Sequence, residues 1–172
     1  MTATQLPSPA FEPEFVSGLT ALFEERIPFN HVLGLRIDTL AADGVSGHLA
    51  MRPDLIGHYV HQRLHGGVIS ATLDAMAGLA VMAAIGARHM GETPSERLRR
   101  FGKLGTIDLR IDYLRPALGE RFLLRAEVLR LGSIAGGADE VMLGIIAKCM
   151  HTLPSRPAAR PPGLPVTPLA RA

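Results

Sequence analysis

The sequence predicts an α+β fold in which an antiparallel sheet of about five strands wraps around one long central helix. Three observations support this prediction. A short amphipathic segment opens the folded part of the chain, a long apolar run occupies its middle, and strand-like segments lie on both sides of that run. Strands grouped around one helix are typical of α+β domains, and 172 residues is the length of a single domain.

Residues 14–27 (EFVSGLTALFEERI) place apolar side chains at helical spacing and precede Pro28, which predicts a short N-terminal helix. Two strands are predicted at 31–41 (HVLGLRIDTLA) and 44–52 (GVSGHLAMR), because these runs meet at Ala-Asp-Gly, a hairpin turn signal. Residues 53–67 predict a loop that leads into the central helix.

The central helix is predicted at about residues 67–88, and a polar loop at 89–103 (HMGETPSERLRRFGK). Residues 104–116 (LGTIDLRIDYLRP) show the clearest strand alternation in the chain. Two further strands are predicted at 120–132 and 140–151. The apolar face of the 104–116 strand consists of Ile107, Leu109, Ile111 and Tyr113.

The domain is expected to span residues 14–153, after a flexible N-terminus at 1–13. Residues 154–172 are rich in proline, contain arginine and predict a disordered tail. The formal net charge is only +2, and this tail accounts for the excess. Binding of nucleic acid is not expected, because it normally requires a basic face or stripe.

The N-terminus shows neither the basic nor the apolar region of a secretory signal, which predicts a cytoplasmic protein. The longest apolar run, residues 66–87, is interrupted by Asp74 and is rich in Ala and Gly. We therefore interpret it as a core helix and not as a membrane span. Cys149 is the only cysteine, and one thiol makes neither an internal disulfide nor a metal site by itself.

The central helix is apolar nearly all around, so it must be buried on all faces. One sheet covers only part of such a helix, and a second subunit is the simplest cover for the rest. Its one carboxylate, Asp74, is costly to bury unless something holds or uses it. Residue chemistry alone leaves two interpretations open: a structural Asp bonded to a serine or to the backbone, and a catalytic carboxylate.

His65, Gly66 and Gly67 stand at the predicted start of this helix, where backbone N–H groups lack intrahelical partners. Glycine lets a ligand carbonyl approach closely, so this is a candidate oxyanion site. Asp74 follows Gly66 by eight residues, which is about 12 Å along one helix. If both act on one carbonyl group, Asp74 must come from the antiparallel helix of a second subunit.

The segment LHGGVISATLDAMAGLA (64–80) resembles the central-helix motif of hotdog-fold acyl-CoA thioesterases, in the branch that includes the phenylacetate-pathway thioesterases. GTIDLRIDYLRPALGE (105–120) is similar to the strand that follows in that family. The resemblance extends from about residue 28 to residue 150. It implies hydrolysis of acyl-CoA to a free acid and coenzyme A, with no cofactor, by a homodimer or a dimer of dimers.

The resemblance also implies roles for individual residues. The Gly66 N–H would polarise the thioester carbonyl, the partner's Asp74 would be general base or nucleophile, and His65 would orient the loop. Six residues before this histidine, members often carry Asn or Gln to hold the water or substrate, whereas this chain has Tyr59. A shift of one residue in the loop would give His58 that role.

Two alternatives concern other residues. His58, His61 and His65 have spacings compatible with a metal, but no acidic or Cys companion lies within reach, so no metal is expected. The basic residues after the central helix predict a solvated loop, and as a group they are candidates to bind the phosphates of coenzyme A. They are Arg97, Arg99, Arg100 and Lys103.

Two other functions are compatible with a hotdog fold. One is a non-catalytic hotdog module that binds acyl-CoA as a sensor, although this length leaves no room for the expected output domain. The other is a hotdog dehydratase, which the sequence disfavours because it shows no Asp/His pair in the arrangement those enzymes use. Nothing in the sequence determines the acyl group.

Overall fold

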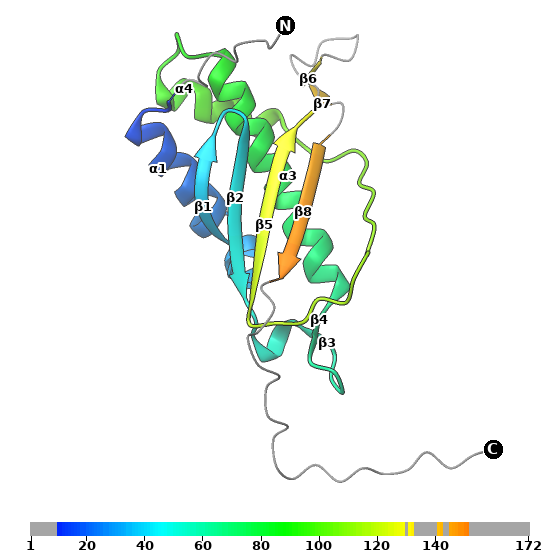
Figure 1. Cartoon of the computed structure of the whole chain (residues 1–172). Coiled ribbons are helices and arrows are strands. Elements are labelled where there is room, and N and C mark those ends of the chain that lie inside the picture. Colours follow the sequence, from blue (N-terminus) through cyan, green and yellow to red (C-terminus); the bar gives the residue numbers. More distant parts are fainter. Residues whose placement is uncertain (1–9, 130, 133–140, 143–144, 152–172) are drawn as a thin grey trace, which may run out of the picture.

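The computed structural model describes residues 10–129, 131–132, 141–142 and 145–151, and it arranges them in two layers (Figure 1). Helix α3 (Gly66–Arg88) packs against one face of a four-stranded antiparallel sheet. Short helices cover the sheet edge at β1 and the far end of α3 (Figure 1). The predicted tail at 154–172 and most of the predicted flexible N-terminus lie outside the described residues.

The N-terminal helix is confirmed, as α1 (Pro13–Ala21) followed by a π-helical turn (Leu22–Arg26). Its apolar side chains Phe15, Leu19 and Phe23 are buried in the main core. A further helix, α2 (Pro28–Leu33), occupies the start of the predicted 31–41 strand, so that boundary was wrong. Gly34 ends α2 at φ 73°, a left-handed conformation that favours glycine.

The sheet order is β1-β2-β5-β8, with every neighbouring pair antiparallel. The bounds are β1 (Arg36–Ala41), β2 (Gly44–Ala50), β5 (Arg121–Val128) and β8 (Ile145–His151). These strands confirm the predicted hairpin and the two C-terminal strands. Two small ladders pair β3 (Ile56–His58) with β4 (Arg63–Leu64), and β6 (Leu131–Gly132) with β7 (Val141–Met142).

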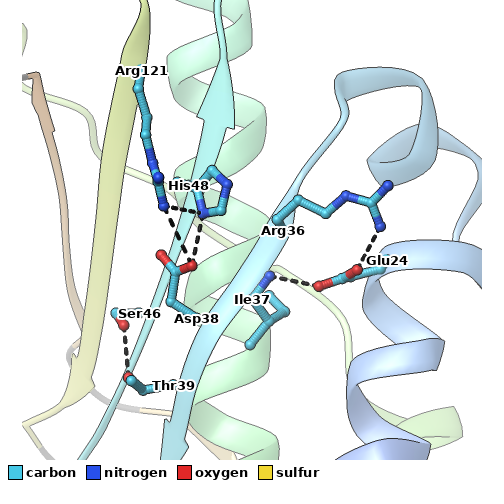
Figure 2. Close-up of polar contacts among 8 residues, drawn as sticks. All are labelled: Glu24, Arg36, Ile37, Asp38, Thr39, Ser46, His48 and Arg121. Atoms are coloured by element: carbon cyan, nitrogen blue, oxygen red, sulfur yellow. Dashed lines mark hydrogen bonds and ion pairs between the residues drawn. The ribbon is translucent and has the colours of Figure 1, made fainter.

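The two faces of the sheet differ in polarity. Toward α3 the sheet contributes buried side chains to the core, namely Val45, Leu49, Phe122, Leu124 and Ala126. The opposite face is polar: His48 Nδ1 lies 2.8 Å from Asp38 Oδ1, and Arg121 Nη2 lies 3.6 Å from the same oxygen (Figure 2). Period-two alternation therefore directs the apolar set to the helix and the polar set to solvent.

Glu24 ties the N-terminal helices to the sheet. Its carboxylate accepts hydrogen bonds from Arg36 Nη1 and from the Ile37 backbone N–H, each at 2.7 Å (Figure 2). The side chain leaves the π-helical turn, and both donors belong to β1. The contact fixes where the first strand begins.

The central helix begins one residue earlier than predicted. By length and composition α3 resembles a membrane span, but 56% of its most apolar window is buried inside the fold. Its second half, from Leu79 to Gly86, is almost entirely buried, whereas most residues between Gly66 and Ala75 are only partly covered. Within one chain, burial on all faces is thus achieved only by the second half of the helix.

The predicted polar loop at 89–103 was wrong in part, because it contains α4 (Pro94–Arg99) and a 3-10 turn (Arg100–Lys103). Thr93 and Glu96 form a capping box: Glu96 N–H donates to Thr93 Oγ1 at 3.3 Å, and Thr93 N–H donates to the Glu96 carboxylate at 2.9 Å. This reciprocal pair starts the helix by satisfying two backbone donors that would otherwise lack partners.

The largest correction concerns residues 104–116, which do not form a strand. The segment returns along α3 without joining the sheet (Figure 1). Its Thr106 and Tyr113 side chains both bond to α3 residues, although an odd spacing would place them on opposite faces of a regular strand. Alternation indicates that a segment can form a strand. Whether a neighbouring strand is available to pair with it depends on the tertiary structure.

Candidate active site

The start of α3 is anchored by backbone hydrogen bonds to two separate segments. His65 N–H donates to the Leu55 carbonyl at 2.8 Å, and Leu64 N–H donates to the Ala117 carbonyl at 3.1 Å. The β3–β4 hairpin delivers the chain to this point, and Gly57 in it lies directly against His65. The residues preceding Gly66 are therefore held in place before the helix begins.

The His65–Gly66 peptide is oriented by the first turn of the helix. The His65 carbonyl accepts hydrogen bonds from Val68 N–H at 3.0 Å and Ile69 N–H at 3.2 Å. Because a carbonyl and its peptide N–H point in opposite directions, the Gly66 N–H points out of the helix start. Among the described residues no acceptor is assigned to it.

His65 itself caps the helix. Its Nδ1 accepts the Gly67 N–H at 2.8 Å, so the second glycine's donor is used internally. Of the two glycine N–H groups, this leaves the Gly66 N–H for a ligand. It lies at a helix N-terminus, where the helix dipole favours negative charge.

Asp74 lies on the same helix two turns later and is partly buried. Its Oδ1 accepts a 2.6 Å hydrogen bond from Thr106 Oγ1. Gly66, Ser70 and Asp74 are spaced by four residues and so share one face of α3. The two predicted catalytic groups thus occupy one helix face, about 12 Å apart along the axis.

Residues 104–118, which we call segment 104–118, run along the face of α3 that carries Gly66, Ser70 and Asp74. At its end near the helix start, Tyr113 Oη donates to the Gly66 carbonyl at 3.1 Å and is also hydrogen-bonded to Ser70 Oγ. Ser70 Oγ donates to the same carbonyl at 3.0 Å. Thr106 bonds to Asp74 at the other end, so one segment contacts both halves of the candidate site.

His58, Tyr59 and His61 lie on the exposed β3–β4 hairpin, beside the helix start. The rings of His58 and His61 are 4.8 Å apart, and the Tyr59 side chain is 80% exposed. In the described part of the chain, no three His, Cys, Asp or Glu residues come together as a metal site. The hairpin thus brings His58 and Tyr59 to the same end of α3 as His65.

Arg100 begins the 3-10 turn that follows α4, and α4 lies at the opposite end of α3 from Gly66 (Figure 1). Its Nε and Nη2 bond to Glu92 at 3.0 and 2.6 Å, and these bonds lower the pKa of the Glu92 carboxyl below its usual 4.5. Within one chain, Arg100 is thus bonded to Glu92 in a turn that follows α4, at the opposite end of α3 from Gly66. Arg97, expected to be a solvated loop residue, is fully buried and stacks 4.5 Å over the Phe15 ring.

Sequence reasoning missed three polar side chains that contact the candidate residues: Ser70, Thr106 and Tyr113. The alternation of residues 104–116 predicts a strand for Thr106 and Tyr113, and nothing in their local sequence indicates a contact with α3. Ser70 had a usable signal, because it lies midway between Gly66 and Asp74 at helical spacing.

The comparisons with known proteins agree on one family. Residues 61–134 match the family model of the thioesterase superfamily. The medium/long-chain acyl-CoA thioesterase YigI of Escherichia coli strain K12 is 37% identical over 112 residues, which is 65% of this chain and 72% of that protein.

Solved structures agree as well. A protein from Shewanella oneidensis related to the thioesterase superfamily has 38% identity and a TM-score of 0.64, covering 71% of this chain and 82% of that one. Mouse thioesterase superfamily member 2 shares the fold at 17% identity and a TM-score of 0.50, covering 77% and 95%. The hotdog fold expected from the resemblance is confirmed, and the chain belongs to the thioesterase superfamily.

Proposed function

We propose that this protein hydrolyses acyl-CoA at a site made by two copies of the chain, with Gly66 from one protomer and Asp74 from its partner. The protein is an acyl-CoA thioesterase, as its relatives at 37% identity are. The observation that carries the composite site is geometric: an outward Gly66 N–H and a polar Asp74 share one helix face but lie about 12 Å apart. A thioester carbonyl carbon and its oxygen are much closer together than that.

The chemistry assigns each group one task. Asp74 takes a proton from water as the water oxygen attacks the thioester carbonyl carbon, or its carboxylate attacks that carbon first and water then hydrolyses the anhydride. The negative charge that develops on the carbonyl oxygen is stabilised by the Gly66 N–H. In the first route the C–S bond breaks after water has added, and the coenzyme A sulfur leaves with the proton that Asp74 took from the water. In the second route the C–S bond breaks as the anhydride forms, and the thiolate gains its proton when water hydrolyses that anhydride. Both routes end with the free acid and coenzyme A.

Exposed apolar side chains support the proposal that a second copy of the chain binds beside α3. Segment 104–118 carries large apolar side chains that one chain leaves in solvent, and it runs beside the partly covered half of α3. Several large apolar side chains left exposed along one segment are typical of an interaction surface. An isologous dimer would cover this surface and would complete two sites at once. The exposed side chains are Ile107, Leu109, Tyr113, Leu114 and Leu118.

The composite site is tested by mixing two inactive variants. Asp74→Asn removes the base, and Gly66→Pro removes the N–H. Proline fits here because position 66 is the first helical residue and His65 already has the extended backbone, φ −65° and ψ 134°, that precedes proline. A Cβ at position 66 would lie 3.4 Å from the Tyr113 ring, an ordinary contact.

A mixed dimer then contains one intact site, made by Gly66 of the Asp74→Asn protomer and Asp74 of the Gly66→Pro protomer. Random assortment makes half of the dimers mixed, so turnover should recover to about a quarter of wild type. The control pairs Asp74→Asn with the double variant Gly66→Pro/Asp74→Asn, which leaves no intact site and should stay inactive. Failure to recover in verified mixed dimers would contradict the composite site.

The acyl group is also a proposal. Because YigI acts on medium- and long-chain acyl-CoA, we propose the same substrate class here. Free thiol release from acyl-CoA esters of increasing chain length measures the preference. Turnover restricted to short or aromatic acyl groups would contradict the proposal while leaving the composite site intact.

A further inference from the structure

We propose that Tyr113, together with Ser70, is a positioning residue that holds the Gly66 carbonyl and, through the shared Cα, keeps the direction of the Gly66 N–H during thioester hydrolysis. This inference rests on the proposed role of the Gly66 N–H. Neither side chain needs to touch the substrate. Both act through the Gly66 carbonyl, which accepts Tyr113 Oη at 3.1 Å and Ser70 Oγ at 3.0 Å.

The number of available protons determines how the three groups share their hydrogen bonds. Tyr113 and Ser70 supply one hydroxyl proton each, and their oxygens are also hydrogen-bonded to one another. When the Tyr113 hydroxyl donates to the Gly66 carbonyl, the Ser70 hydroxyl donates either to the same carbonyl or to Tyr113 Oη. When the Tyr113 hydroxyl donates to Ser70 Oγ, the Ser70 hydroxyl donates to the Gly66 carbonyl. In every arrangement the Gly66 carbonyl receives at least one hydroxyl proton, and either hydroxyl alone can supply it.

Gly66 needs this support because of its residue type. Two successive glycines are the most flexible backbone in a chain, and here they stand where the proposed oxyanion donor must be held still. The Gly67 N–H and the Gly66 carbonyl belong to one peptide group, and the 2.8 Å bond from this N–H to His65 Nδ1 holds one side of it. Tyr113 and Ser70 hold its carbonyl side, and the Tyr113 ring lies 3.4 Å from where a Cβ on Gly66 would be. Three side chains thus fix the peptide between the two glycines, and through the Gly66 Cα they limit how far the preceding N–H can turn.

A purely structural role predicts different behaviour. Ser70 Oγ also donates to the Gly66 carbonyl, so removing the Tyr113 hydroxyl leaves this carbonyl bonded and should cost little global stability. If Tyr113 only packed against the helix start, removing the hydroxyl would change neither activity nor stability by much. A positioning role predicts lower turnover at unchanged stability.

The first test removes the hydroxyls one at a time and together. Tyr113→Phe and Ser70→Ala should each lower kcat by about threefold to tenfold, with KM nearly unchanged, because the remaining hydroxyl still bonds to Gly66. The double variant should lose more than the product of the two single effects, since no hydroxyl then remains. The matched control is another hydroxyl pair, Thr39 and Ser46, whose oxygens lie 2.6 Å apart on the polar sheet face (Figure 2).

The control double variant Thr39→Val/Ser46→Ala should keep wild-type kcat and KM. Equal kcat values in the Tyr113/Ser70 and Thr39/Ser46 double variants would overturn the inference, as would a loss of kcat that only follows a loss of folded protein. If Gly66→Pro also retains turnover, the proposed function of Gly66 fails. If Gly66→Pro is inactive and the Tyr113/Ser70 variants are normal, only the positioning role fails.

A spectroscopic measurement separates positioning from packing. In an Asp74→Asn background, which should bind acyl-CoA without hydrolysing it, the infrared stretch of a ¹³C-labelled thioester carbonyl reports its hydrogen bond. Adding Tyr113→Phe and Ser70→Ala should shift this band toward its position in free acyl-CoA. A band that stays at its bound position in the triple variant would overturn the inference.

Discussion

Thr106 Oγ1 donates a hydrogen bond of 2.6 Å to Asp74 Oδ1 across 32 residues of sequence. The bond occupies one carboxylate oxygen and limits the rotation of the group, and in the proposed reaction the other oxygen, Oδ2, faces the water. It also joins the segment after α4 to the middle of α3. Thr106 therefore positions the residue that we propose as base or nucleophile.

We expect Thr106→Val to lower turnover by about tenfold, because the carboxylate loses its orientation while the volume of the side chain is kept. Thr106→Ser keeps the hydroxyl and should stay within about twofold of wild type. Steady-state kinetics on a medium-chain acyl-CoA measures both. Equal turnover in the Val and Ser variants would show that the bond does not orient Asp74.

Asp74→Asn keeps the size of the side chain and its ability to accept from Thr106, but it removes the charge. Turnover should fall by about 10² or more, the scale expected for a positioned proton-transfer group. Calorimetric titration with acyl-CoA should still show binding. Hydrolysis that falls only in proportion to folded protein would instead support a structural Asp74.

Gly86 lies where α1 crosses the end of α3, and a Cβ at this position would come 2.5 Å from the Phe15 ring. We expect Gly86→Ala to lower the free energy of unfolding by about 1–3 kcal/mol, because the ring must move to make room. The control is Gly91→Ala, whose added Cβ meets nothing within 4 Å. Denaturant unfolding measures both, and equal stabilities would contradict the close packing seen here.

Buried Arg97 joins α1, α3 and α4 by bonding to the Glu12 carboxylate and, at 3.4 Å, to the Gly86 carbonyl. The hydrogen bond from Arg97 lowers the pKa of Glu12 below its usual 4.5. A lowered folded-state pKa stabilises the fold above pH 4.5, and this contribution is lost as the pH falls through the folded-state pKa.

We therefore expect the Tm of the wild-type protein to fall on acidification below pH 4.5 by more than the Tm of Glu12→Gln, which carries no titrating group at this position. The control is Glu25→Gln, which changes an exposed carboxylate of the π-helical turn. Scanning calorimetry across this range measures the difference. Parallel acid curves for wild type and Glu12→Gln would contradict the Arg97–Glu12 bond.

Local sequence patterns were enough to predict the main elements. The central helix, the first hairpin and the two C-terminal strands follow from periodicity and turn residues, which act over neighbours in the chain. The capping box of Thr93 and Glu96 is visible in the sequence, but the helix that follows it has only six residues and gives no clear period, so the pattern there predicts a loop. The strand boundary at His31 was missed because α2 is similarly short.

By itself, the sequence determined the α+β class and placed Gly66 and Asp74 on one helix, because these features depend on residue type and on spacing along one element. The thioesterase activity was implied by the resemblance of residues 64–80 and 105–120 to hotdog thioesterases. Only the tertiary structure decided that segment 104–118 leaves the sheet and brings Thr106 and Tyr113 to α3. An alternating segment satisfies its backbone equally well beside several neighbours, so its partner is decided by the packing of the whole chain and not by its own residues.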